Sequence, residues 1–83
     1  MIRSKGFLQE GRALEICDRR FMTSFELWIY ENDRPLGYHS RVSLREAASG
    51  MLEGIDVLGR AMNDAIGDVV SGRFDMLARR ASA

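Results

Sequence analysis

The sequence predicts an α+β domain: an antiparallel β-meander of three strands, or four, followed by a long C-terminal amphipathic helix packed on one sheet face. Two patterns lead to this prediction. Alternating apolar and polar residues in the first half of the chain are typical of strands with one buried face, and a 3–4 spacing of apolar residues in the second half is typical of a helix. At 83 residues, the chain is expected to form a single domain over 1–83.

The first predicted strand lies in GRALEICD, residues 11–18, where Leu14 and Ile16 alternate with small or polar neighbours. Residues 1–10 form either a flexible arm or a weak edge strand. In the second case, residues 6–9 would pair with the strand that follows. Whether the sheet has three or four strands therefore depends on whether this segment pairs.

A hairpin follows, with one strand from about Phe21 to Glu31 and the other from Leu36 to Val42. The residues between them favour a turn because Pro presets its own φ angle and the side chains of Asn and Asp hydrogen-bond to the local backbone. The predicted turn comprises Asn32, Asp33, Arg34 and Pro35.

The hydrophobic pattern also predicts a register for this hairpin. Pairing Glu26 with His39 and Trp28 with Gly37 gathers the apolar side chains on one face, and a slip of one residue would turn them to the other. An aromatic side chain opposite a glycine also covers backbone that would otherwise be bare. The predicted core-facing residues are Phe25, Leu27, Ile29, Leu36 and Tyr38.

The predicted helix begins with a capping box, in which Ser43 precedes Glu46 by three residues. The helical spacing continues for about 27 residues, which corresponds to a length of about 40 Å. Residues 73–83 are expected to form a C-terminal tail or a short helix. The spacing is carried by Leu44, Ala48, Met51, Ile55, Leu58, Met62, Ala65 and Val69.

A helix of this length would overhang strands that are about 25 Å long, and its apolar arc is wider than one sheet contact requires. The excess apolar surface predicts a homodimer. The alternative is a helix that breaks at Gly59 or Gly67 and folds back. The residues expected to form the dimer or helix packing are Met51, Ile55, Leu58, Met62 and Ile66.

The composition excludes several classes of protein. No apolar run approaches the roughly 20 residues needed to span a bilayer, and no signal peptide is evident, so a cytoplasmic protein without membrane contact is expected. A single cysteine, Cys17, cannot form an intramolecular disulfide. With one histidine and one cysteine, no metal site is expected, and no cofactor motif is found.

The predicted register leaves an aromatic and charged group on the sheet face away from the helix. Trp and Tyr are enriched at the energetic centres of protein interfaces, which favours binding of another protein. A second interpretation is an acid–base pair, because a carboxylate opposite His39 could orient the imidazole. The candidate partner-binding residues are Trp28, Tyr30, Glu26, His39 and Arg41, and no catalytic residue is assigned.

Nucleic-acid binding is an alternative that the charge balance does not favour. The chain carries 12 basic and 12 acidic residues, so it lacks the net basic charge typical of phosphate binding. The first 23 residues are nevertheless basic, with five basic residues against three acidic ones. The candidate phosphate contacts there are Arg12, Arg19 and Arg20.

The segment VSLREAAS, residues 42–49, is similar to the helix start of double-stranded-RNA-binding domains, but Arg45 alone represents the lysine cluster of that family. Ser43, Glu46 and Ala47 are also similar to the helix start of HicB-like antitoxins. We assign the chain to neither family. The sequence predicts a small non-catalytic interaction or regulatory protein of bacterial or phage type, antitoxin-like or inhibitor-like, acting as a homodimer. The alternatives are a nucleic-acid-binding module and, third, a small dimeric enzyme using His39 and Glu26.

Overall fold

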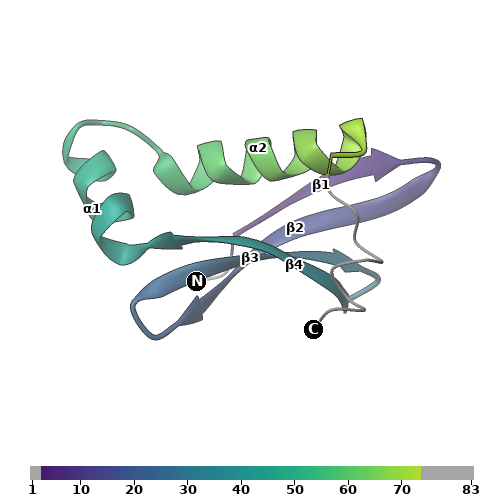
Figure 1. The fold of residues 1–83 in the computed structure, drawn as a ribbon, viewed down its shortest axis with the longest axis horizontal. Helices are drawn as coiled ribbons and strands as arrows, with labels where there is room; N and C mark the ends of the chain where they lie inside the picture. Colours follow the sequence, from purple (N-terminus) through teal and green to yellow (C-terminus); the bar gives the residue numbers. More distant parts are fainter. Residues whose placement is uncertain (1–2, 74–83) are drawn as a thin grey trace.

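The computed structural model describes residues 3–73, and residues 1–2 and 74–83 are not described. A four-stranded antiparallel sheet is followed by two helices, so the α+β class is confirmed and the edge segment is the fourth strand (Figure 1). The predicted tail or short helix over 73–83 lies outside the described residues, except for Arg73. In chain order, which for the strands is also their order in the sheet, the elements are β1 (Ser4–Gln9), β2 (Arg12–Phe21), β3 (Ser24–Glu31), β4 (Arg34–Ser43), α1 (Leu44–Leu52) and α2 (Val57–Ser71).

Short turns join consecutive strands. The turn between β3 and β4 consists of Asn32 and Asp33, with φ angles of 50° and 65°. Two-residue hairpin turns with positive φ match the twist of the flanking strands, and Asn and Asp tolerate that conformation. The predicted four-residue turn is therefore too long, because Arg34 and Pro35 belong to β4. Glu10 and Gly11 form the corresponding turn between β1 and β2.

The predicted register of the β3–β4 hairpin is correct only next to the turn, where Tyr30 lies opposite Pro35. The register shifts between Ile29 and Tyr30 and again between Leu27 and Trp28. Each shift is a bulge that inserts one extra residue into β4 and changes which face the following side chains occupy. Trp28 consequently lies opposite Tyr38 rather than Gly37.

The single long helix is wrong, and the alternative of a broken helix is correct except for its position, because the break lies at residues 53–56 and not at Gly59 or Gly67. The capping box at Ser43 is confirmed, since the Ser43 hydroxyl accepts a hydrogen bond from the Glu46 backbone N–H at 3.0 Å. The helix then ends after Leu52, and Gly54 in the connection has a φ of 75°, a left-handed conformation that suits glycine. The apolar spacing continues across the connection, which is why the break is not visible in the pattern.

The core lies between the sheet and α2. Leu14 and Ile16 of β2 and Leu27 and Ile29 of β3 belong to this core, with Ile16 directly opposite Ile29, and each of these four side chains is at most 1% exposed. Figure 1 shows α1 and α2 on the same side of the sheet. None of the helices within residues 3–73 is long and apolar enough to cross a membrane. The other buried apolar residues of the core are Val42, Leu58, Met62, Ala65 and Val69.

Candidate functional site

The sheet face opposite the helices carries a cluster of aromatic and charged residues centred on Trp28. We call this face the outer face. The rings of Trp28 and Tyr38 meet edge to face with their centroids 5.8 Å apart, and the Arg19 guanidinium lies 5.2 Å from the centroid of Trp28. The Trp28 indole N–H donates a hydrogen bond to Glu26 Oε1 at 3.0 Å. Cation–π and edge-to-face contacts hold these side chains in one arrangement.

The structure brings four of the five predicted partner-binding residues to the outer face. Trp28 and Tyr30 lie opposite Cys17 and Glu15 of β2, and Glu26 lies between Arg19 and Arg41. Two members of the cluster, Arg19 and Tyr38, were not among the predicted partner-binding residues. Tyr38 was expected in the core, and its placement on the outer face follows from the bulges, which the hydrophobic pattern does not reveal.

His39 does not belong to the outer face. It is the extra residue of the second bulge, and its Nε2 lies 3.0 Å from Asp68 Oδ2 of α2, while its Nδ1 lies 2.7 Å from Ser40 Oγ. The hydrogen bond from His39, together with one from Arg73, lowers the pKa of Asp68. Glu26 lies on the other side of the sheet, opposite Arg41. The predicted pairing of His39 with Glu26 is therefore wrong, and the acid–base interpretation built on it is withdrawn.

The predicted dimer residues do not form one surface. Leu58 and Met62 are buried in the core, and Ile66 is partly buried against it. Met51 is 77% exposed on α1, and Ile55 lies in the connection between the helices. Because α1 and α2 are separate helices, no 40 Å helix overhangs the sheet, and the overhang no longer supports self-association.

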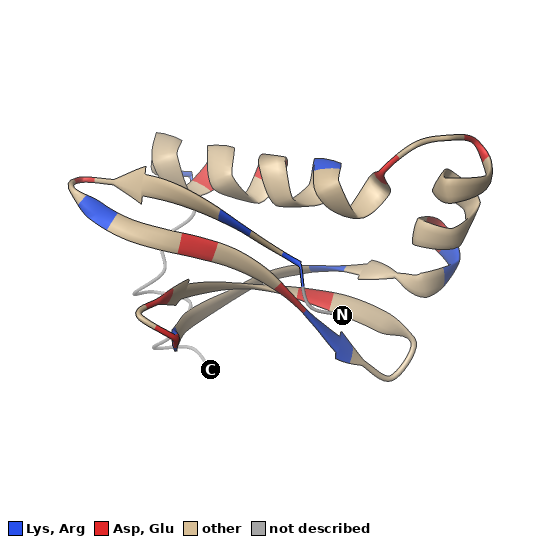
Figure 2. Ribbon diagram, turned by 180° about the vertical axis from the view of Figure 1, so that it is seen from behind, with Lys and Arg blue, Asp and Glu red and all other residues tan. Residues whose placement is uncertain are grey.

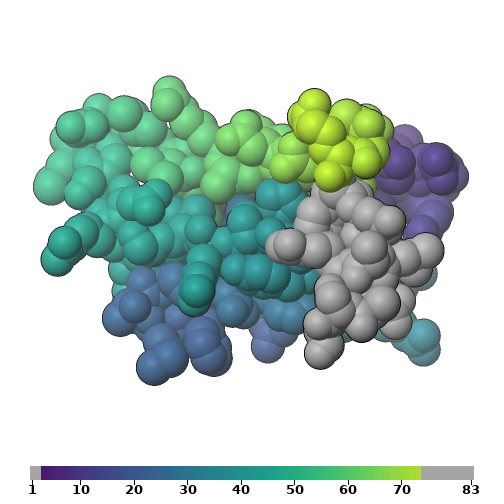
Figure 3. Space-filling model, in the orientation of Figure 1, coloured from purple at the N-terminus to yellow at the C-terminus, as the bar shows by residue number. Residues whose placement is uncertain are grey.

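Four of the six exposed large apolar residues within residues 3–73 lie at one end of the molecule, while Leu8 and Val70 lie elsewhere. Phe21 and Met22, next to the β2–β3 turn, are 52% and 78% exposed, and Leu52 of α1 is 90% exposed. The Leu44 backbone N–H donates to Thr23 O at 2.9 Å, which ties the start of α1 to this turn. Figure 3 shows both segments at the same end. Exposed apolar residues concentrated in this way are typical of interaction surfaces.

The three predicted phosphate contacts all interact within the chain. Arg12 forms a bidentate pair with Glu31, with N–O distances of 2.9 and 2.7 Å, and Arg20 donates to the Met22 carbonyl at 3.1 Å. Arg19 packs on Trp28. Figure 2 shows acidic and basic residues interspersed along the strands, without a continuous basic stripe. This arrangement does not favour phosphate binding.

Cys17 lies half-buried on the outer face opposite Trp28. Burial raises the pKa of this thiol, and the nearby carboxylates of Glu15, Asp18 and Asp33 raise it further. A thiolate is the reactive form of cysteine, so a raised pKa makes this side chain a poor nucleophile near neutral pH.

An ion pair between Arg3, just before β1, and Asp56, just before α2, links the starts of these two elements. The Arg3 guanidinium donates to both carboxylate oxygens of Asp56, at 2.9 and 2.8 Å, and Asp56 also caps α2 by accepting from the Gly59 N–H at 3.0 Å. A Cβ atom on Gly59 would collide with the Asp56 carboxylate, so glycine leaves room for this contact. Lys5 Nζ adds a hydrogen bond of 3.0 Å to Asn63 Oδ1 one turn further along α2.

The Arg3 pair predicts acid-sensitive stability. The hydrogen bonds from Arg3, and then the one from Gly59, lower the pKa of Asp56 well below its usual value. Because the unfolded state then binds more protons than the folded state, stability falls as the pH drops below about 5. The Asp56 side chain is 60% exposed, so solvent screening keeps the effect modest. Urea unfolding of Asp56→Asn should show lower stability than wild type at pH 7 and a weaker loss toward acid.

The control for this prediction is Asp64→Asn, the same substitution at an exposed position of α2 for which no ion pair is found within residues 3–73. This variant should keep the pH profile of the wild type. Parallel pH profiles for wild type and Asp56→Asn would contradict a stabilising role for the Arg3 pair.

Metal binding finds no support in the described part of the chain, because residues 3–73 contain no group of three His, Cys, Asp or Glu side chains placed to hold an ion. Comparison of the chain with protein families, with curated proteins and with solved structures finds no match. The interpretation of the site therefore depends on its geometry.

Proposed function

We propose that the chain is a small, non-catalytic, cytoplasmic regulatory module that binds another protein through the outer face of its sheet. The observation that carries the proposal is the cluster of Arg19, Trp28 and Tyr38. Trp, Tyr and Arg are the residue types most enriched at the energetic centres of protein interfaces. Both helices within residues 3–73 pack on the opposite side, so neither covers this cluster.

The charges around the cluster indicate the chemistry of the partner surface. Arg19 and Arg41 lie on either side of Glu26, and their strand positions place all three on one face. A complementary partner would present an apolar group to Trp28 and acidic groups to the two arginines. The indole N–H is already bonded to Glu26, so contact with the ring would not leave this donor buried and unpaired.

Trp28→Ala should reduce capture of the partner by about tenfold or more, since hot-spot residues typically contribute 2 kcal/mol or more. Affinity purification from the native host would compare wild type, Trp28→Ala and Trp28→Phe. Arg60→Ala, at an exposed position of α2 on the other side of the sheet, is the matched control. Far-ultraviolet circular dichroism would verify that each variant folds.

A partner that is lost with Trp28→Ala but kept with Trp28→Phe and Arg60→Ala supports the proposal. Equal recovery in all four samples would overturn it. Recovery of nucleic acid that disappears with rising salt would favour the phosphate-binding alternative instead.

We also propose that the protein forms a homodimer. The contact surface would be the apolar end that contains Phe21, Met22 and Leu52, in place of the long helix expected from the sequence. Sedimentation equilibrium at micromolar concentration should give the mass of a dimer, and Leu52→Glu should shift it toward the monomer. Leu8→Glu, at a residue that is 72% exposed in the edge strand, is the control. A monomeric wild type at these concentrations would contradict self-association.

A further inference from the structure

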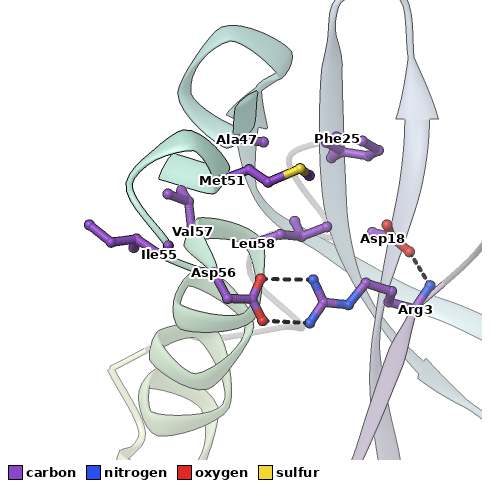
Figure 4. Close-up of a pocket in the computed structure, with 10 residues that line it drawn as sticks. Arg3, Asp18, Phe25, Ala47, Met51, Ile55, Asp56, Val57 and Leu58 are labelled. Carbon is purple, nitrogen blue, oxygen red and sulfur yellow. Dashed lines mark hydrogen bonds and ion pairs between the residues drawn. The ribbon is translucent and has the colours of Figure 1, made fainter. Parts of the chain in front are cut away.

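A cavity of about 480 Å³ opens beneath the connection between α1 and α2, on the helix side of the sheet. Pockets that hold small organic ligands typically range from about 300 to 1,000 Å³ and are largely apolar with a few polar groups. Figure 4 shows the side chains around this cavity. The apolar ones include Phe25, Met51 and Leu58, and the charged ones are Arg3, Asp18 and Asp56.

Asp18 is the unusual residue of this cavity. It follows Leu14 and Ile16 on the buried face of β2, and it is only 3% exposed. Carboxylates are rarely buried to this degree unless they are paired, because leaving water costs the charge its hydration. A third apolar residue would be the ordinary choice at this position of the strand.

The described contacts satisfy only part of the Asp18 carboxylate. Oδ1 accepts a hydrogen bond of 2.6 Å from the Arg3 backbone N–H. Oδ2 has no donor within residues 3–73, and because no fully buried side-chain oxygen there lacks a partner, this atom is accessible from outside the packed interior. The Arg3 guanidinium binds Asp56 instead, as the paired dashed lines in Figure 4 show. Two carboxylates and one guanidinium give the cavity wall a formal charge of −1.

Holding the start of β1 does not require a charged residue at this position. Asp18 and Arg3 also share a backbone hydrogen bond of 3.1 Å, and a neutral amide oxygen could accept from the Arg3 N–H in the same place. Holding the Arg3 backbone therefore explains neither the negative charge of Asp18 nor its second oxygen, Oδ2. They are suited to a cationic donor that enters the cavity.

We propose that this cavity binds a small primary amine with an apolar body. The ammonium group donates to Asp18 Oδ2, and the body packs against Phe25, Leu58 and the exposed side chain of Met51. Methionine is flexible and polarizable, so Met51 at the rim can adapt to the shape of the bound group. The site lies across the sheet from the outer face and does not depend on the protein interaction proposed above.

Titration with 2-phenylethylamine, followed by amide chemical shifts at pH 7, tests the proposal. Saturable shifts are expected at Asp18, Phe25 and Leu58. The neutral 2-phenylethanol and the anionic 3-phenylpropanoate have similar bodies and should bind at least about tenfold more weakly, which corresponds to about 1.4 kcal/mol. Equal affinity for the three probes, or no saturation by the amine at millimolar concentration, would overturn the proposal.

Asp18→Asn keeps an oxygen for the Arg3 N–H but removes the charge, so it should weaken amine binding by about tenfold and leave binding of the alcohol unchanged. Asp64→Asn on the exposed side of α2 is the matched control and should bind like wild type. Unchanged amine affinity in Asp18→Asn would contradict the assignment of this carboxylate. If Asp18→Asn does not fold, the relative affinities of the wild type for the three probes test the amine site by themselves.

Discussion

Ile29→Ala is expected to lower the free energy of unfolding by about 2–5 kcal/mol. Ile29 is fully buried at the centre of the sheet, where it lies opposite Ile16 and beneath α2. Removing its side chain loses the apolar transfer energy and leaves a cavity that the packed neighbours cannot fill. A domain of this size has a total stability of only about 4–12 kcal/mol, so this loss is a large fraction of the total.

Urea unfolding followed by tryptophan fluorescence measures this effect, because Trp28 lies next to Ile29 in β3. Ile29→Val removes one methylene group and should cost about 0.5–1.5 kcal/mol. Leu8→Ala, at a residue that is 72% exposed, should change stability by less than about 0.5 kcal/mol. Equal effects of Ile29→Ala and Leu8→Ala would contradict the assigned core.

Gly50→Ala is expected to destabilise the protein by up to about 2 kcal/mol, although alanine is the better helix former. Gly50 lies in α1 where the chain turns back toward α2, and a Cβ atom there would collide with Val57 Cγ2 and lie 3.0 Å from the Ile55 carbonyl oxygen. The β-branched side chain of Val57 has little freedom to move away. Overpacking typically costs 1–3 kcal/mol, which exceeds the gain of about 1 kcal/mol in helix propensity.

Gly67→Ala is the matched control because it makes the same substitution inside α2. The nearest atom to its added methyl group would be Arg73 Nη2 at 4.0 Å, which is ordinary contact. This variant should therefore be more stable than wild type by about 0.5–1 kcal/mol. Thermal unfolding of both variants gives the comparison, and a stabilising Gly50→Ala would show that the two helices do not meet at this residue.

Local patterns predicted much of the fold. The alternation of Leu14 and Ile16 identified β2, and the Ser43–Glu46 pair identified the start of α1. Both depend on residues close together in the chain, whose conformational preferences act locally. The end of α1 could not be predicted in the same way, because the spacing from Met51 to Ile55 is helical even though the chain between them is not.

The composition of the site was harder to predict because it depends on the two bulges in β4. A hydrophobic pattern is satisfied equally well by an unbroken register, which places His39 beside Glu26 and Tyr38 in the core. The observed sheet reverses both placements. The sequence also could not predict the contacts of Asp18. Only the structure shows that the Arg3 guanidinium binds Asp56, while Asp18 accepts a hydrogen bond from the Arg3 backbone N–H.

The order of the strands has a consequence for how the chain folds during synthesis. Each strand pairs with its neighbours in the chain, so both hairpins and the pairing between them need only short loops to close. The contacts between β1 and α2 are different, because Arg3 and Lys5 are 53 and 58 residues away from their partners. A growing chain can therefore form its sheet early but leaves the apolar side exposed until α2 has been made, and this interval is when aggregation is most favoured.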